Sequence, residues 1–195
     1  MNGTVRLLAF AGSTRADSHN RKLLNLAAKA ALDAGAAVTA IDLGELALPL
    51  YDGDLEATAG IPEGGRHLKS LMASHDGLLI ASPEYNSGLS AVLKNAIDWA
   101  SRRDGDEPGL ASYQGLVAAM VSASPGRLGG ARGLMSLRQV LTSCGVLVIP
   151  KQFTLAEAHK AFDDTGDLID PGHAATLEGA INALVETAAR LKADD

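Results

Sequence analysis

The chain has 195 residues, of which 47% are hydrophobic and 21% are charged, so it is long enough for one globular domain and too apolar for a disordered chain. Its net charge of −6 argues against a general nucleic-acid binder, because such proteins neutralise phosphates with Lys and Arg. The single cysteine, Cys144, excludes an intrachain disulfide and every multi-cysteine metal site. We therefore predict one soluble domain over residues 1–195.

Short apolar runs alternate along the chain with amphipathic ones, which is the pattern of a βαβ protein with a parallel sheet. Strands are predicted at residues 5–11, 37–42, 77–82, 115–122 and 145–149, and helices at 20–34, 65–74, 89–100, 130–143 and 174–192. Residues 43–63, which contain Pro49 and Pro62, are predicted to form a long loop.

Five strands and five helices in strict alternation predict an α/β fold of the flavodoxin-like, doubly wound type. Its five-stranded parallel sheet has the strand order 2-1-3-4-5 and carries helices on both faces. This arrangement fits the pattern better than the six-stranded dinucleotide-binding fold does. Ligands of such sheets bind beyond the carboxyl ends of the strands where the strand order reverses, so the loops after strands one and three matter most.

The loop after the first predicted strand has the composition of an anion site. Residues 12–20 read Gly-Ser-Thr-Arg-Ala-Asp-Ser-His-Asn and lead directly into a helix. Backbone N–H groups at a helix N-terminus, hydroxyl groups and an arginine all favour a phosphate. The candidate residues are Ser13, Arg15, Ser18 and Asn20, although each serine and the asparagine could instead be an ordinary helix cap.

The loop after the third predicted strand, residues 82–88, reads Ser-Pro-Glu-Tyr-Asn-Ser-Gly. It offers an amide, a hydroxyl and an aromatic face, which suit a flat heterocycle with polar edges, but its residues are also ordinary turn formers. Residues 122–130, after the fourth strand, are glycine-rich and can approach a ligand closely. The chain has neither Gly-x-Gly-x-x-Gly nor Gly-x-x-x-x-Gly-Lys-Ser/Thr, which argues against a Rossmann dinucleotide site and a nucleotide triphosphatase.

Residues 12–20 and 82–88 together resemble the two signature loops of the NADPH-dependent FMN reductases, a family that includes quinone, azo-dye and chromate reductases. Residues 93–99, Leu-Lys-Asn-Ala-Ile-Asp-Trp, continue the second signature. The resemblance implies FMN as the cofactor and NADPH or NADH as the cosubstrate. It implies that the phosphate is held by Ser13, Arg15, Ser18 and Asn20, that the ribityl chain and ring are lined by Pro83, Glu84, Tyr85, Asn86 and Ser87, and that the polar edge of the ring lies near Ser122, Ser124 and Gly126.

The resemblance also implies the reaction: a hydride passes from NAD(P)H to bound FMN, and two electrons then pass to a quinone, flavin, azo compound or metal-ion acceptor in a ping-pong cycle. No catalytic acid, base or nucleophile is needed, because the flavin supplies the chemistry. The five histidines show no metal-ligand spacing, so no metal is expected.

Two competing functions fit the same fold. A flavodoxin-type electron carrier would not oxidise NAD(P)H itself, and such carriers typically sandwich the ring between aromatic side chains. Tyr85 is the only aromatic residue in the predicted ring-binding loop, which favours the enzyme. A phosphoacceptor receiver domain needs an aspartate at the end of strand three, where this chain has Ser82.

Further expectations concern assembly, cosubstrate choice and location. The resemblance implies a homodimer or homotetramer with the helix at 89–100 in the interface, and it favours a subunit contact for Trp99 over a place at the edge of the core. Arg127 is expected to bind the 2′-phosphate of NADPH, as one of four acid-poor arginines, which are Arg102, Arg103, Arg127 and Arg132. No signal-like segment and no run near the ~20 apolar residues of a membrane span is present, so a cytoplasmic protein without membrane or nucleic-acid partners is expected.

Overall fold

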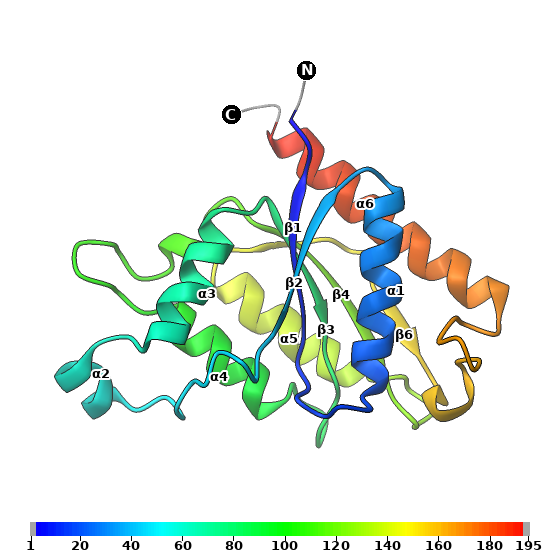
Figure 1. The fold of residues 1–195 in the computed structure, drawn as a ribbon, viewed down its shortest axis with the longest axis horizontal. Helices are drawn as coiled ribbons and strands as arrows, with labels where there is room; N and C mark the ends of the chain where they lie inside the picture. The colour runs from blue at the N-terminus through cyan, green and yellow to red at the C-terminus, as the bar shows by residue number, and fades with distance from the viewer. Residues whose placement is uncertain (1–2, 193–195) are drawn as a thin grey trace.

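The computed structural model describes residues 3–192, which form a parallel sheet in the order β2-β1-β3-β4-β5 (Figure 1). The strands are β1 (Arg6–Ala11), β2 (Ala37–Asp42), β3 (Gly77–Ala81), β4 (Val117–Ala123) and β5 (Leu147–Val148), and a further short strand, β6 (Phe153–Leu155), also pairs with β4. The predicted strand order and doubly wound topology are confirmed.

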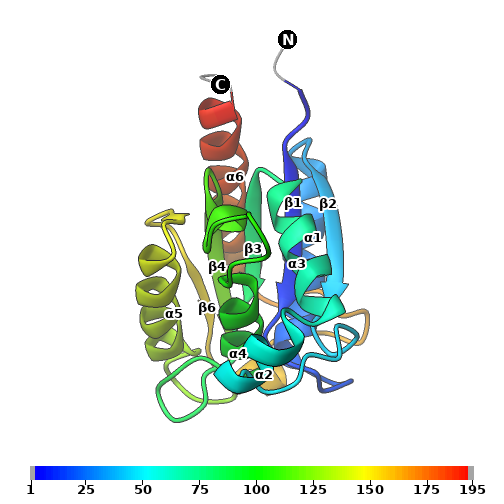
Figure 2. The ribbon, with the colours of Figure 1, turned by 90° about the vertical axis from the view of Figure 1, so that its left-hand side faces the viewer.

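Helices cover both faces of the sheet, as predicted (Figures 1 and 2). One face carries α1 (His19–Asp33) and α6 (Pro171–Lys192), and the other carries α3 (Glu63–Ala73), α4 (Ala91–Ala100) and α5 (Ala131–Ser143). Short 3₁₀ turns, η1 (Ala111–Tyr113) and η2 (Ala158–Lys160), lie in the connections. No helix within residues 3–192 is both long enough and apolar enough to cross a membrane.

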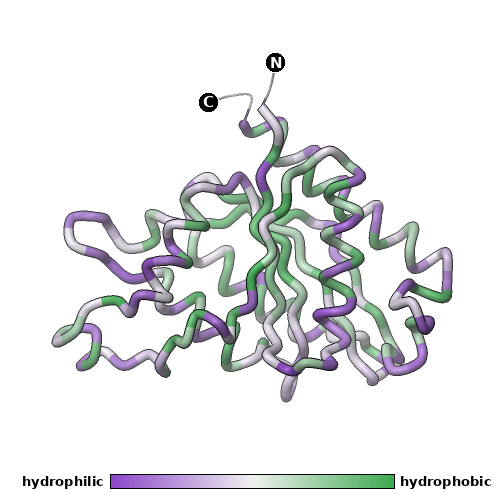
Figure 3. Tube along the Cα trace, in the orientation of Figure 1, coloured by the Kyte–Doolittle hydropathy of each residue, from purple (hydrophilic) through white to green (hydrophobic). Residues whose placement is uncertain are grey.

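The central strands are apolar because both of their faces are covered. In β1, Leu7 packs into the core beneath α1 and α6, while its neighbour Leu8 packs into the core beneath α3, α4 and α5. Successive side chains of a strand point to opposite faces, so a strand between two helical layers must be apolar throughout. Figure 3 shows these strands as the hydrophobic centre of the molecule.

The fifth strand is divided, whereas the sequence predicts one continuous strand over residues 145–149. β5 pairs with the start of β4, and β6 pairs with its end. Between them Pro150 has no N–H group for the ladder. Arg138 of α5 instead donates hydrogen bonds to the carbonyl oxygens of Val148 and Ile149, at 3.1 and 2.9 Å. The chain therefore leaves the sheet after Ile149 and returns to it at Phe153.

The predicted long loop at residues 43–63 contains a short helix, α2 (Gly53–Ala59), which lies at the periphery of the fold (Figure 1). Asp52 caps its N-terminus by accepting a hydrogen bond from the N–H of Asp54 at 2.8 Å, and Gly60, with a φ of 72°, ends it. None of its residues is buried. The helix was missed because a helix without a buried face has no apolar periodicity to read.

Trp99 is fully buried within the single chain, so the prediction that it forms a subunit contact is wrong. Its Nε1 donates a hydrogen bond to the carbonyl oxygen of Pro49 at 2.8 Å, and its ring meets that of Tyr51 edge-on with the centroids 5.0 Å apart. Asn95 donates to the same carbonyl and accepts from the N–H of Tyr51, both at 2.8 Å. These two side chains of α4 therefore fasten residues 49–51 to the body of the protein.

Candidate functional site

Three loops meet at the carboxyl edge of the sheet, which is the lower edge in Figures 1 and 2. They are the first loop (residues 12–20), the second loop (82–88) and the third loop (122–130). A Cβ atom on Gly12 would lie 3.1 Å from Cδ of Pro83, so the first and second loops are in contact. Ser90 donates a hydrogen bond to the carbonyl oxygen of Gly12 at 2.6 Å and fixes this contact from the start of α4.

The first loop presents hydrogen-bond donors at the N-terminus of α1. Ser18 is the N-cap, and its Oγ accepts a hydrogen bond from the N–H of Arg21 at 3.4 Å. Oγ of Ser13 accepts from the N–H of Arg15 at the same distance of 3.4 Å. Because both hydroxyl groups act here as acceptors, their own hydrogens can be donated to a ligand. The helix dipole adds a partial positive charge at this point.

Arg15 supplies the net charge of the first loop. Its side chain is exposed and forms no ion pair within residues 3–192. Asp17, the one acid in the loop, lies 2.7 Å from Nζ of Lys22, and this hydrogen bond lowers the pKa of Asp17 below its ordinary value. Burial lowers the pKa of His19 below its ordinary value, which disfavours a positive charge on this residue. The charge of Asp17 is therefore balanced by Lys22, and that of Arg15 remains.

Asn20, predicted to hold the phosphate, lies behind the loop surface and is 3% exposed. Its Nδ2 donates to the carbonyl oxygen of Ala123 at 2.8 Å, and its Oδ1 accepts from the N–H of the same residue at 3.0 Å. Both ends of the amide are thus engaged by the end of β4. Asn20 ties the start of α1 to the third loop.

The second loop is a tight two-residue turn that exposes its backbone. Tyr85 and Gly88 exchange two backbone hydrogen bonds of 3.0 Å each, and between them Asn86 and Ser87 have φ angles of 50° and 66°. Positive φ at both central positions is the geometry of a type I′ turn. Within residues 3–192, the N–H groups of Asn86 and Ser87 donate to no backbone acceptor. Tyr85, the residue before them, is 52% exposed.

Glu84 is predicted to line the cofactor, but its carboxylate is used inside the protein. Oε2 accepts a hydrogen bond from the N–H of Gly133 at 3.0 Å, and Oε1 lies 2.6 Å from Nη2 of Arg132. Both partners belong to the first turn of α5, and the side chain of Glu84 is only 9% exposed. What Glu84 can offer a ligand is therefore its backbone.

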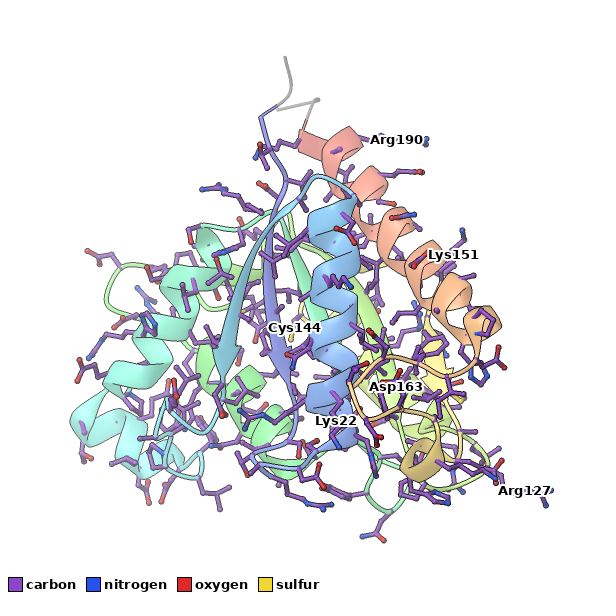
Figure 4. All side chains as sticks on the ribbon, turned by 45° about the vertical axis from the view of Figure 1, so that its right-hand side comes forward. Lys22, Arg127, Cys144, Lys151, Asp163 and Arg190 are labelled. Carbon is purple, nitrogen blue, oxygen red and sulfur yellow. The ribbon has the colours of Figure 1, made fainter. Side chains whose placement is uncertain are left out.

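The third loop also turns part of its predicted set inward. Ser122 is fully buried, its Oγ has no hydrogen-bond partner within residues 3–192, and a Cβ on Gly130 would collide with that oxygen. Oγ of Ser124 accepts from the N–H of Gly126 at 3.1 Å. Gly126 is exposed, and Arg127 beside it points away from the body of the molecule (Figure 4).

The four arginines predicted to be acid-poor differ from one another. Arg102 donates to both carboxylate oxygens of Glu56 at 3.0 Å, and Arg132 pairs with Glu84, so the prediction is wrong for these two. Arg103 donates to the carbonyl oxygen of Gly105 at 2.9 Å. Arg103 and Arg127 form no ion pair within the described part of the chain, and of these two Arg127 belongs to the third loop.

Comparison with known proteins identifies the family to which a chain with these three loops belongs. A model of the NADPH-dependent FMN reductase family matches residues 5–160. An NAD(P)H-dependent FMN reductase of Pseudomonas aeruginosa is 34% identical over 193 residues, which is 98% of this chain and 100% of the relative. The chain belongs to the NADPH-dependent FMN reductase family. The predicted class, an FMN-dependent NAD(P)H oxidoreductase, is thereby confirmed.

Other members of the family extend the comparison. A quinone reductase of Escherichia coli is 32% identical over 197 residues, covering 98% of this chain and 100% of the relative. The solved structure of the flavoenzyme NAD(P)H:(acceptor) oxidoreductase FerB from Paracoccus denitrificans superposes with a TM-score of 0.78 and 31% identity, covering 96% of this chain and 98% of that one. The similarity therefore covers nearly all of this chain in sequence and, against FerB, in fold.

The residues of the three loops fit the cofactor that the family implies. A phosphate monoester needs charged and hydroxyl donors, and the first loop supplies Arg15, Ser13 and Ser18 around a helix N-terminus. A flat ring with polar edges needs exposed backbone donors and an aromatic surface, which the second loop supplies. Within residues 3–192, no group of three His, Cys, Asp or Glu side chains is placed to hold a metal ion.

The residues that hold these loops in place were not identified from the sequence. Ser90 and Gly133 act through contacts with residues 78 and 49 positions away, so no local motif reveals them. Ser90 had one readable signal, because a serine before an apolar helix is a typical N-cap. The helix was predicted to begin at residue 89, which concealed that signal.

Proposed function

We propose that the first, second and third loops hold FMN, and that the chain uses it to transfer two electrons from NADPH or NADH to a small-molecule acceptor in a ping-pong cycle. A quinone, a flavin, an azo compound or a metal ion is an acceptor of this class. The single observation that supports the proposal best is the contact between an anion-binding first loop and a second loop whose backbone and Tyr85 are exposed. The relatives described as FMN reductase and quinone reductase support the same reaction.

Each loop has its own part in binding. The side chains of Arg15, Ser13 and Ser18 bind the phosphate, and Asn20 positions their helix through Ala123. The second loop contributes mainly backbone groups and the ring of Tyr85 to the flavin. The full set proposed to line the ribityl chain, the ring and its polar edge is Pro83, Glu84, Tyr85, Asn86, Ser87, Ser122, Ser124 and Gly126, with Glu84 acting through its backbone and Ser122 from beneath Gly130.

The chain's own residues bind and orient the reactants. When bound, FMN supplies the hydride and electron chemistry. Tyr85 is the only aromatic residue of the three loops, so the chain can cover one ring face with an aromatic side chain and leaves the other to a nicotinamide or an acceptor. This favours an enzyme over an electron carrier. No side chain is assigned as a catalytic acid, base or nucleophile.

We further propose a single cytoplasmic domain that assembles as a homodimer or homotetramer. Large apolar side chains are exposed on several elements, and Leu50, Leu128 and Met135, at 80%, 55% and 68%, are among the most exposed of them. A partner subunit would cover apolar surface of this kind. Light scattering of the purified protein, coupled to gel filtration, gives the number of subunits.

Two measurements on the purified chain test the function. The absorbance spectrum should show flavin bands, or should acquire them when FMN is added. NADPH should then be oxidised steadily in the presence of a quinone. Failure to take up FMN would overturn the proposal, and FMN binding without turnover unless another reductase is added would identify an electron carrier.

A further inference from the structure

The second loop is strained and has few supports. Two non-glycine residues, Asn86 and Ser87, stand in the left-handed backbone region. L-residues adopt this region at a cost, so such a turn persists only where the surrounding structure fixes it. Its two internal hydrogen bonds, between Tyr85 and Gly88, close the turn but do not attach it to the rest of the protein.

The side chain of Glu84 provides an attachment directly beside the turn. Its carboxylate binds the N–H of Gly133 at 3.0 Å and the guanidinium of Arg132. A side chain at Gly133 would be crowded, because a Cβ would lie 3.0 Å from Cβ of Glu84, 3.1 Å from its Cα and 3.2 Å from the carbonyl oxygen of Gly88. The start of α5 is therefore packed closely against both ends of the turn.

We propose that Glu84 is a positioning residue: its carboxylate locks the second loop onto the first turn of α5 and so fixes the backbone that faces the flavin. The inference rests on the proposed function of the loops. Glu84 does not touch the cofactor through its side chain. It acts through Tyr85, Asn86 and Ser87, whose backbone course it sets.

Two features of the contact agree with this role. The N–H of Gly133 belongs to the first turn of a helix, where it has no partner within the helix and where the dipole favours an anion. Partial burial raises the pKa of Glu84, but the hydrogen bonds from Gly133 and Arg132 outweigh it and hold the pKa below its ordinary value. The carboxylate is thus ionised, and its attachment complete, at neutral pH.

The test separates the reach of the side chain from its charge. Glu84→Gln keeps the length and an acceptor for the N–H of Gly133, whereas Glu84→Asp keeps the charge but is one methylene shorter. Asp76 offers a matched control, because its carboxylate likewise binds a backbone N–H, that of Arg6 at 2.7 Å, but at the opposite end of the sheet. Each full-length variant, freed of flavin, is titrated with FMN and with riboflavin, and its melting temperature is measured to confirm that it is folded.

If the wild type binds no FMN, the proposed function itself is wrong. That outcome is distinct from failure of the inference about Glu84, which is judged only by comparing variants with a wild type that binds. Where wild type binds, we expect Glu84→Ala and Glu84→Asp to weaken both FMN and riboflavin by about tenfold and Glu84→Gln to stay within about threefold. Gln keeps an acceptor at the same reach for the N–H of Gly133, whereas Ala has no acceptor and Asp is too short to place one there. The visible circular dichroism of bound FMN should change in the same two variants. Asp76→Ala should lower the melting temperature without changing either affinity.

Three results would overturn the inference. The first is a folded Glu84→Ala variant with the FMN affinity and dichroism of the wild type. The second is an equal loss of affinity in Asp76→Ala, which would reduce the effect to general destabilisation. The third, which stands even if Glu84→Ala does not fold, is a Glu84→Gln variant that binds FMN more weakly than Glu84→Asp.

Discussion

The first and second loops lie side by side at one edge of the sheet, yet they direct their side chains oppositely. In the first loop Arg15 is exposed, and the hydroxyls of Ser13 and Ser18, although largely buried, keep their own hydrogens for a ligand. In the second loop the carboxylate of Glu84 points into the protein and the backbone of the turn is exposed. The first loop is suited to recognise charge through side chains, and the second to recognise a flat surface through its backbone shape.

Removing the charge of the first loop should have the largest effect. Arg15→Ala is expected to weaken FMN binding by ~1.5–3 kcal/mol, or about 10- to 150-fold, because a charged hydrogen bond to the phosphate is lost. Riboflavin, which lacks the phosphate, should bind the variant and the wild type equally. Isothermal titration measures both affinities.

Arg21→Ala is the matched control for Arg15. Its guanidinium lies 2.8 Å from Oδ2 of Asp42 and is already paired. It should leave FMN affinity unchanged. Equal losses for FMN and riboflavin in Arg15→Ala would mean that Arg15 supports the loop and does not read the phosphate.

Changing the shape of the second loop should have the next largest effect. Ser87→Val is expected to reduce the free energy of unfolding by ~1–2 kcal/mol, because a side chain branched at Cβ fits poorly at a φ of 66°. Ser87→Gly should match or exceed the wild type, since glycine accepts this conformation freely. Urea unfolding followed by circular dichroism measures the difference. If the valine and glycine variants were equally stable, the turn would not be under conformational strain.

The acids of the two loops should respond differently to pH. The pKa of Glu84 is lowered by Gly133 and Arg132 against the effect of burial, so its stabilising contribution is complete above the ordinary value of 4.5 and is lost as the pH falls below it. The free energy of unfolding of wild type should therefore approach that of Glu84→Gln between about pH 5 and pH 3. Asp17 also has a lowered pKa, but its side chain is 80% exposed, so Asp17→Asn should follow wild type closely. A larger effect for Asp17→Asn would reverse this comparison.

The role of the first loop could be predicted from sequence more fully than that of the second. The first loop acts through its side chains, whereas the second acts through the shape of its backbone. The sequence gives the chemistry of each side chain directly, so an arginine and two serines before a helix predict an anion site. The alternation of apolar runs likewise predicts the strand order. Contacts between residues far apart in the chain leave no such local pattern. Asn20 reads as a phosphate ligand, and no local pattern shows that its amide also bonds at both ends to Ala123, 103 positions away. The split of β5 and the exposed helix α2 have equally little local signature.

The smallest effect is expected in the third loop. Arg15 is proposed to bind the phosphate of FMN, and the question here is whether Arg127 binds the 2′-phosphate of NADPH. Arg127 is exposed beside Gly126 and forms no ion pair within residues 3–192, so an ion pair between it and the 2′-phosphate of NADPH would be exposed to water and weak. Arg127→Ala should lower the ratio of kcat/KM for NADPH to that for NADH about two- to fivefold, consistent with an exposed ion pair of up to ~1 kcal/mol. The matched control is Arg103→Ala, which removes an exposed arginine that contacts the carbonyl oxygen of Gly105 and should leave the ratio unchanged.

FMN affinity should not change in either variant, because FMN affinity depends on the first loop. An unchanged ratio in Arg127→Ala would remove the third loop from cosubstrate recognition and leave Arg15 as the phosphate-binding arginine of the three loops.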